Sequence, residues 1–245
     1  RKHHRSNLLA LNKRLTMDLL RQRRQAGALC ANDAKSCYDR IVHLIAVLAL
    51  RRLGMAAAPV QSMFETLQRA KHHVSTAFGV SDKSYGGARR NPPLQGVGQG
   101  NGAGPAIWAV ISTVIIAAMA TQGHGFNILS AMSCALVSFV CYAFVDDTDV
   151  IHVAPSVAAR GEEVIAEMQV VLDRWGGLLR ATGGALVPSK SYWHAIDFRW
   201  NGSKWVCRTA HDMPGEIWIT DINGSRVILQ RYEAEVGQET RGVCI

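Results

Sequence analysis

The sequence predicts an α+β fold made as one continuous domain. Helical and strand patterns alternate along its 245 residues: the strongest helical stripe runs from 164 to 179, and short apolar strands are predicted at 29–35 and around 137–153. Asn-Gly pairs at 201 and 223 mark two hairpins near the end. No internal repeat or linker divides the chain, and its 48% hydrophobic residues can build a sizeable core.

The first half of the chain favours helices around one buried strand. The predicted elements are, in order, a basic amphipathic helix at 7–26 with Leu8, Leu11, Leu15 and Leu19 on one stripe, a strand at 29–35, a helix from 41 to Gly54, a helix from Pro59 and a strand at 74–78. The arginines near the end of the first helix could contact phosphates or complement the helix dipole.

The second half begins with a loop at 81–104 that is rich in Gly, Pro and Arg. Glycine at every second position from 96 to 104 lets a ligand approach the backbone closely. An apolar helix is predicted at 105–121. Apolar strands at 137–145 and 149–153 then place Asp146-Asp147 at the tip of a hairpin, and the chain after 193 is β-rich.

Composition favours an anionic partner. The chain carries 27 Lys and Arg against 19 Asp and Glu, a net charge of +8, and its pI is near 9.4. Nucleic acid is therefore the first expectation and a membrane surface the second. The six cysteines contain no C-x-x-C pair, which indicates reduced thiols and an intracellular protein, with the nucleus as one candidate compartment. The N-terminus is not typical of a secretory signal.

A membrane hairpin is the structural alternative. Residues 103–122 and 126–145 contain no Asp, Glu, Lys or Arg. However, the first stretch opens with a Gly-rich loop and Pro105, the second contains several polar residues and ends on two aspartates, and no Lys/Arg cluster flanks either one closely. We expect both stretches to be buried core.

Three acidic residues stand in apolar surroundings: Asp33 and the pair Asp146-Asp147. A carboxylate at the end of an apolar strand loses hydration, and adjacent carboxylates repel each other, so their ionised forms require positive charge nearby. Ligation by carboxylate oxygens alone suits Mg²⁺. This pattern is typical of two-metal phosphoryl transfer.

Five blocks follow one another along the chain: Asn-Asp-Ala-Lys-Ser-Cys-Tyr-Asp-Arg-Ile at 32–41, Gln-Gly-Asn-Gly-Ala-Gly-Pro at 99–105, Phe-Val-Asp-Asp at 144–147, Gly-Gly-Ala-Leu-Val-Pro-Ser-Lys at 183–190 and Thr-Arg-Gly-Val at 240–243. In this order they resemble, the last one faintly, the palm of a reverse transcriptase (RNA-directed DNA polymerase), most like those of non-LTR retrotransposons and group II introns. Gly104 stands where the family usually has Ser, and Arg241 where it usually has Leu.

The resemblance implies a polymerase palm-like antiparallel sheet with helices packed on one face and a β-rich C-terminal appendage. It implies that Asp33, Asp146 and Asp147 bind two Mg²⁺ ions, with Mn²⁺ as a substitute, and that Lys190 is a catalytic residue near the triphosphate, proposed to protonate the leaving pyrophosphate. The nucleotide-binding residues that it implies are Ala34, Tyr38, Gln99 and Gly100, with Tyr38 as the gate against a ribose 2′-hydroxyl. The implied partners are an RNA template, a DNA primer and deoxynucleoside triphosphates.

In this interpretation residues 1–27 are a remnant of the fingers, 28–192 form the palm, and 193–245 are a hairpin region leading to a possible primer grip, without a thumb. We therefore expect full activity to need flanking sequence. Alternatives stay open for single residues: Tyr38 as a core aromatic, Lys190 as a surface lysine, and Asp39 and Asp149 as polar neighbours rather than ligands. Two alternatives stay open for the whole chain: a decayed or domesticated palm that binds nucleic acid without synthesis, and an RNA-directed RNA polymerase.

Overall fold

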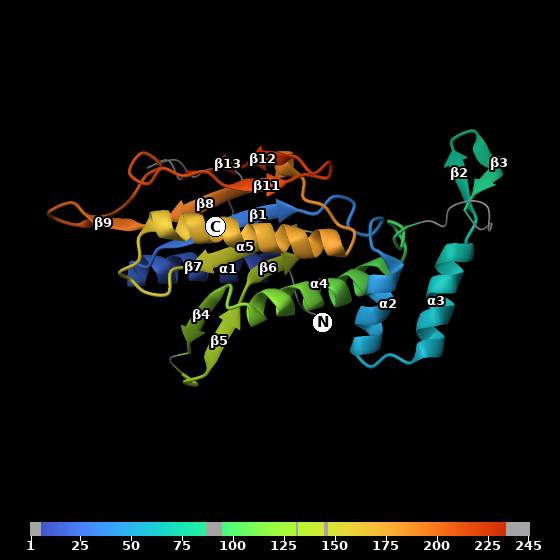
Figure 1. Ribbon diagram of the computed structural model, residues 1–245, viewed down its shortest axis with the longest axis horizontal. Helices are drawn as coiled ribbons and strands as arrows, with labels where there is room; N and C mark the ends of the chain where they lie inside the picture. Colours follow the sequence, from blue (N-terminus) through green and yellow to red (C-terminus); the bar gives the residue numbers. More distant parts are fainter. Residues whose placement is uncertain (1–5, 87–94, 131, 145–146, 234–245) are drawn as a thin grey trace. The chain divides into compact units, whose positions relative to one another are not determined.

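The computed structural model describes residues 6–86, 95–130, 132–144 and 147–233 (Figure 1). The chain divides into two compact units. The first, called the sheet unit, contains residues 1–35, 115–180 and 185–245, and the second, called the helical unit, contains residues 36–114 and 181–184.

A five-stranded sheet forms the centre of the sheet unit, in the order β13-β8-β1-β7-β6. Its strands are β1 (Gly27–Asp33), β6 (Cys141–Phe144), β7 (Asp147–Val153), β8 (Tyr192–Ile196) and β13 (Gln230–Arg231). All neighbours pair antiparallel except β13 and β8, which are parallel. Ala28, Leu29 and Cys30 of the middle strand β1 are all buried, which explains its nearly continuous apolar sequence.

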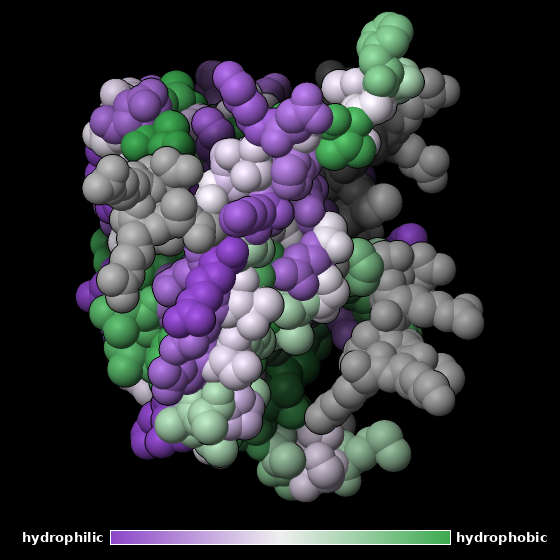
Figure 2. Space-filling view, turned by 90° about the vertical axis from the view of Figure 1, so that its right-hand side faces the viewer, coloured by the Kyte–Doolittle hydropathy of each residue, from purple (hydrophilic) through white to green (hydrophobic). Residues whose placement is uncertain are grey.

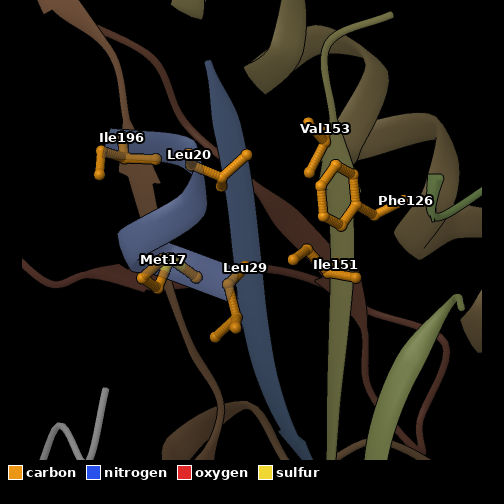
Figure 3. Close-up of a cluster of buried hydrophobic side chains, with 7 residues drawn as sticks. All are labelled: Met17, Leu20, Leu29, Phe126, Ile151, Val153 and Ile196. Atoms are coloured by element: carbon orange, nitrogen blue, oxygen red, sulfur yellow. The ribbon is translucent and has the colours of Figure 1, made fainter. Parts of the chain in front are cut away.

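Helix α1 (Ser6–Arg23) packs on one face of this sheet. Figure 3 shows Met17 and Leu20 of α1 in one buried cluster with Leu29 of β1 and Ile151 of β7. Leu29 and Ile151 are opposite each other in the ladder and so share this face. A Cβ at Gly27 would lie 2.8 Å from Leu20, so glycine at that position permits the close approach of the helix. Burying one such aliphatic side chain stabilises the fold by about 1.5–3 kcal/mol.

Helix α5 (Gly161–Ala181) packs on the opposite face. His152 of β7 points to that side and contacts Glu167 of α5, with 2.6 Å between the imidazole Nε2 and a carboxylate oxygen. The buried side of α5 is the stripe that the sequence predicts, with Val164, Ile165, Met168, Val171, Leu172, Trp175 and Leu179.

Three further hairpins belong to the sheet unit. They are β4 (Phe126–Leu129) with β5 (Leu136–Phe139), β9 (Phe198–Trp200) with β10 (Trp205–Cys207), and β11 (Trp218–Thr220) with β12 (Arg226–Ile228). The last two turn at the Asn-Gly pairs. The side-chain oxygen of Asn201 accepts the backbone N–H groups of Ser203 and Lys204, which closes the first of these turns.

The helical unit contains α2 (His43–Arg52), α3 (Ala57–Arg69) and the hairpin of β2 (His72–Thr76) with β3 (Gly79–Tyr85). Helices α2 and α3 bury Ala46, Ala49, Leu50, Val60 and Phe64. Figure 2 shows one face of the molecule, on which a band of hydrophilic residues lies beside hydrophobic ones.

The predicted α+β class with a palm-like sheet and a β-rich C-terminal region is confirmed, with differences in detail. The sheet is mixed because β13 is parallel to β8, and α1 and α5 cover opposite faces instead of one. The predicted loop at 81–104 begins as strand β3, because the turn at Ala77-Phe78 folds this segment back onto β2. Strand β4 was not predicted.

Helix α4 (Gly104–Thr121) is the helix predicted from Pro105. It is long and apolar enough to cross a membrane, with a mean hydropathy of 1.8. However, its buried residues Ile107, Trp108, Ile111, Ile115 and Met119 recur every three or four positions. This one-sided burial is typical of a helix that packs against a protein core.

Candidate active site

The ends of β1 and β7 bring two of the three predicted carboxylates together. Asp33 is the last residue of β1, Asp147 is the first of β7, and the two are direct partners in the antiparallel ladder. Such partners have Cβ atoms about 4.5–5.5 Å apart and point to the same face. Two ionised carboxylates in this arrangement repel each other, so the pair favours the binding of a cation.

Asp147 begins the second strand of the β6–β7 hairpin. Phe144 of β6 pairs with Asp147 of β7, so only residues 145 and 146 connect the two strands. Asp146 itself lies outside the described residues.

Residues 185–191 run beside the end of β1 and deliver a lysine to it. Val187 donates its N–H to the carbonyl of Asp33, and Lys35 donates to Ala185. The 3-10 helix η1 (Pro188–Lys190) follows, and the hydroxyl of the buried Ser191 donates to Val187. These bonds fix the backbone on both sides of Lys190, so its position depends on the fold and not on a free loop.

Lys190 forms an ion pair with Asp33, with 3.2 Å between its Nζ and a carboxylate oxygen. The lysine side chain is 68% exposed and the aspartate 18%. An exposed ammonium group beside a half-buried carboxylate can exchange that partner for a phosphate at small cost. Ala34, the next residue of the chain, is buried and bridges to Leu186.

The neighbouring aspartate has a different environment. Asp149 lies on the same face as Asp147, and Lys13 of α1 contacts it at 2.6 Å, with both side chains 15% exposed. Burial, with the charge of Asp149 as the second cause, raises the pKa of Cys141 to about 12 and also raises that of Cys30. Both thiols therefore stay protonated at neutral pH and are poor metal ligands.

The donor set fits Mg²⁺. Asp33 and Asp147 offer hard carboxylate oxygens on one face at a strand end, which is the ligand type that Mg²⁺ prefers. No group of three or more His, Cys, Asp or Glu suited to a metal occurs within the described ranges, which exclude Asp146. Asp146, the third predicted ligand, lies outside the described residues.

Three of the four predicted nucleotide-binding residues, Tyr38, Gln99 and Gly100, lie in the helical unit, whereas Ala34 belongs to the sheet unit. Tyr38 is half-buried in the turn after β1, and its carbonyl accepts the N–H of Val97. A Cβ added to Gly104 would lie 3.4 Å from the Tyr38 ring. The ring therefore packs on the start of α4, where Gly104 leaves room for it.

The Gly-rich loop is held to the turn at Tyr38. A Cβ at Gly96, whose φ is 79°, would lie 2.3 Å from the backbone of Asp39, so only glycine fits. The carboxylate of Asp39 accepts the N–H of Gln99 at 2.8 Å. Gln99 and Gly100 are exposed next to this bond. The loop thus presents both residues to solvent from a defined backbone.

Sequence reasoning did not find the residues that support this site. Lys13 contacts Asp149, which is 136 positions later in the sequence, and the hydroxyl of Ser191 accepts the N–H of Asp33, which is 158 positions earlier. Only knowledge of the strand register could have indicated these two residues. The block at 240–243, with Arg241, lies outside the described residues.

No family model matches the chain, and no curated protein matches it. Two solved structures are similar to it at 13% identity over 82% of this chain: apo telomerase from Candida tropicalis truncated from its C-terminal domain (TM-score 0.49) and telomerase from Candida albicans in complex with a TWJ fragment of telomeric RNA (TM-score 0.44). The match covers 37% and 31% of those chains, so this chain spans about a third of their length. These are distant likenesses of fold.

Proposed function

We propose that the chain is the palm of an RNA-directed DNA polymerase that performs template-directed nucleotidyl transfer. The observation that carries this proposal is the placement of Asp33 and Asp147 as opposed partners at adjacent strand ends, with Lys190 3.2 Å from Asp33. A metal-binding carboxylate pair beside an exposed cation suits the binding of a nucleoside triphosphate.

Asp33, Asp146 and Asp147 would hold two Mg²⁺ ions, with Mn²⁺ as a substitute. When bound, the ions would neutralise charge on the attacking and leaving oxygens of the phosphoryl displacement. Asp33 and Asp147 would hold the ions in fixed positions, because both extend from paired strands whose backbones cannot separate without breaking the sheet.

Lys190 would bind the triphosphate and donate a proton to the leaving pyrophosphate. Its exposed Nζ is within reach of solvent and substrate, while η1 and Ser191 fix its backbone. In the absence of substrate, the ion pair with Asp33 holds the ammonium group at the carboxylates. An ammonium group is a suitable general acid for an alkoxide or phosphate leaving group.

Four residues would bind the nucleotide. Tyr38 would stack under the sugar and exclude a 2′-hydroxyl, and Gln99 and Gly100 would support the template base and incoming nucleotide. Ala34, the residue after the proposed metal ligand Asp33, would be the fourth nucleotide-binding residue. This proposal is supported by the packing of the Tyr38 ring on Gly104 and by the bond between Asp39 and the N–H of Gln99.

The proposed partners and the proposed type of element rest on the sequence motifs that resemble a reverse transcriptase. An RNA template, a DNA primer and deoxynucleotides are the proposed partners, inside the cell, and a non-LTR or group II type of element is the proposed source of the domain. The net charge of +8 supports a nucleic-acid partner.

Primer extension on an RNA template tests the polymerase proposal. The full chain is compared with the double variant Asp146→Asn/Asp147→Asn and with Asp173→Asn, which removes a carboxylate from an exposed ion pair on α5. We expect the double variant to lose at least about a hundredfold in rate, because each lost ligand removes transition-state charge stabilisation. If the double variant still incorporates nucleotides, the assignment of Asp146 and Asp147 as metal ligands is wrong.

The same assay separates the alternatives. Tyr38→Ala should raise ribonucleotide incorporation, whereas unchanged sugar selectivity would make Tyr38 a packing residue. Ribonucleotide incorporation by the unmodified chain would favour an RNA-directed RNA polymerase. Template binding with no incorporation by any form of the chain would favour a non-catalytic palm.

A further inference from the structure

A basic groove lies at the end of the sheet unit remote from Asp33. It has a volume of about 500 Å³ and is lined by the end of α1, the segment before α5 and the β9–β10 hairpin. Ile196 of β8 pairs with Gly27, the first residue of β1, whereas Asp33 is the last. At about 3.4 Å per residue, β1 separates the two places by about 20 Å.

Five of the lining residues are arginines and two are acidic. The arginines are Arg23, Arg24, Arg160, Arg199 and Arg208, and the acidic residues are Glu162 and Asp197. Both acids are bound by Arg208. Arg23, Arg24 and Arg160 form no ion pair within the described part of the chain. The groove therefore retains positive charge that its own carboxylates do not neutralise.

Aromatic rings lie at the same place. Trp205 of β10 is 42% exposed and Trp200 of β9 is 54% exposed, with 5.8 Å between their ring centroids. The guanidinium carbon of Arg24 lies 4.5 Å above the Trp205 ring. This stacking uses the face of the guanidinium group and leaves its N–H edge for an anion.

The backbone at Arg24 departs from its usual preference. The N–H of Arg24 bonds to the carbonyl of Arg21, and that of Gln25 to Leu20, which is a Schellman helix end. Arg24 occupies the left-handed position of this motif, with a φ of 55°, where glycine is preferred. A strained arginine whose side chain is fixed over an exposed tryptophan indicates a function for that side chain.

We propose that this arginine–tryptophan groove binds single-stranded nucleic acid. Its arginines contact phosphates, and Trp205 with Trp200 offers ring surface to unstacked bases. Single strands are the nucleic acids that combine accessible phosphates with accessible base faces, which matches a groove with both features. The groove lies apart from the proposed catalytic carboxylates, and its binding does not require them.

The test is fluorescence anisotropy of the full chain with a labelled twelve-nucleotide oligouridylate, without divalent metal or nucleotide. The critical variant is Arg24→Gly, because glycine suits the helix end and should keep or raise the thermal midpoint of unfolding. We expect Arg24→Gly to bind about tenfold more weakly, as expected for one lost charge-assisted contact. The slope of log K against log salt should fall by about 0.7.

A matched control removes the same charge elsewhere. Arg23→Ala/Arg24→Gly is compared with Arg51→Ala/Arg52→Ala, which removes two exposed arginines from the last turn of α2. Equal losses in both double variants would show that net charge alone attracts the strand, and would overturn the proposal. A loss confined to the first variant supports it.

The role of Trp205 in binding bases is tested separately. Trp205→Phe keeps a ring in the hairpin, and Trp205→Leu removes it; we expect the leucine variant alone to lose about tenfold in affinity for the oligonucleotide. Heparin serves as a polyanion without bases. If heparin competes as well as oligouridylate and both Trp205 variants bind as the unmodified chain does, the groove is a general anion site and the proposal fails. Because no polymerisation is measured, an inactive catalytic site leaves this test unaffected.

Discussion

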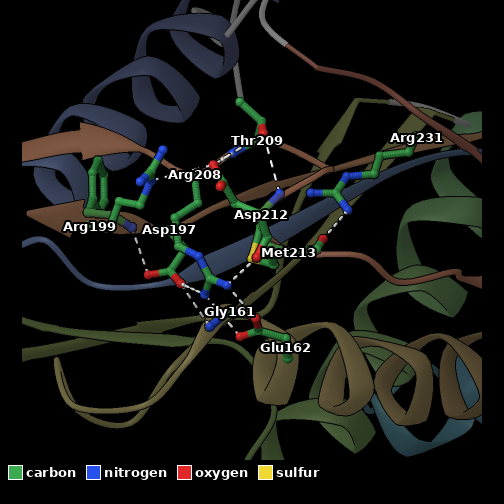
Figure 4. Close-up of polar contacts among 10 residues, drawn as sticks. Gly161, Glu162, Asp197, Arg199, Arg208, Thr209, Asp212, Met213 and Arg231 are labelled. Atoms are coloured by element: carbon green, nitrogen blue, oxygen red, sulfur yellow. Dashed lines mark hydrogen bonds and ion pairs between the residues drawn. The ribbon is translucent and has the colours of Figure 1, made fainter. Parts of the chain in front are cut away.

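At one end of the central sheet Asp33 and Asp147 face each other across two strands, whereas at the other end Asp197 and Glu162 are bound by one arginine. Arg208 pairs with both acids, and Asp197 also accepts the N–H of Gly161 (Figure 4). The only described ion pair of Asp33 is with Lys190, whose side chain is 68% exposed. The acids at one end are thus held by an arginine that is only 17% exposed, whereas Asp33 at the other end is paired with a lysine that is open to solvent.

Removal of Arg208 should have the largest effect on stability. The side chains of Arg208 and Asp197 are only 17% and 10% exposed, and Arg208 also donates to the carbonyl of Asp212. Arg208→Ala leaves Asp197 with an uncompensated charge, which costs on the order of 3 kcal/mol in the free energy of unfolding. Urea denaturation measures this difference.

Arg226→Ala is the matched control for that measurement. Its ion pair with Asp173 has side chains that are 50% and 44% exposed, so its loss should cost less than about 1 kcal/mol. Equal losses in the two variants would mean that Arg208 acts as an ordinary surface residue, and the contrast between the two ends of the sheet would be wrong.

The interaction of Glu162 with Arg208 should also make the stability of the fold depend on pH in the acid range. Hydrogen bonds from Arg208 lower the pKa of Glu162 from 4.5 to about 2. Because the pKa is lower in the folded state, the unfolded chain binds more protons between these values, and the stability from Glu162 is lost as pH falls from about 4.5 to about 2. The Glu162 side chain is 42% exposed, so solvent screening reduces this contribution.

We therefore expect Glu162→Gln to have a shallower loss of stability over that pH range than the unmodified chain. Glu163→Gln is the control, since Glu163 is the next residue of α5 and forms no ion pair among the residues that the structure describes. Urea midpoints at pH 5.5, 4.5 and 3.5 measure the slopes. Parallel slopes for the Glu162 variant and the unmodified chain would contradict the assignment to Arg208.

Features that depend on neighbouring residues could be predicted from the sequence, whereas contacts between distant residues could not. The helix at 161–181, the hairpin before Asp147 and both Asn-Gly hairpins follow from local periodicity and turn chemistry, and each was predicted. The contact of Arg208 with Glu162 joins residues 46 positions apart, and no local pattern indicates it.

Helix α1 shows the limit within a single element. Its leucine stripe predicts a buried face, yet Leu8, Leu11 and Leu15 are 46–56% exposed, while Met17 and Leu20 are buried. Leu19, the last residue of that stripe, packs against the buried cluster, and Lys13 forms an ion pair with Asp149 on β7. Periodicity predicted the helix, but which of its residues face the sheet depends on contacts that are distant in sequence.

The smallest effect is expected at the acidic end, and its sign depends on metal. Without divalent cations, Asp147→Asn removes repulsion between directly opposed carboxylates and should raise the free energy of unfolding by about 0.2–1 kcal/mol. With Mg²⁺ at ten times its dissociation constant, the unmodified chain should gain about 1.4 kcal/mol from binding, and the variant less, because it has lost a ligand. The order of the two midpoints should then reverse. A variant that is less stable without metal, or equal stabilisation of both forms by Mg²⁺, would show that Asp147 is a structural residue and that both ends of the sheet use their acids alike.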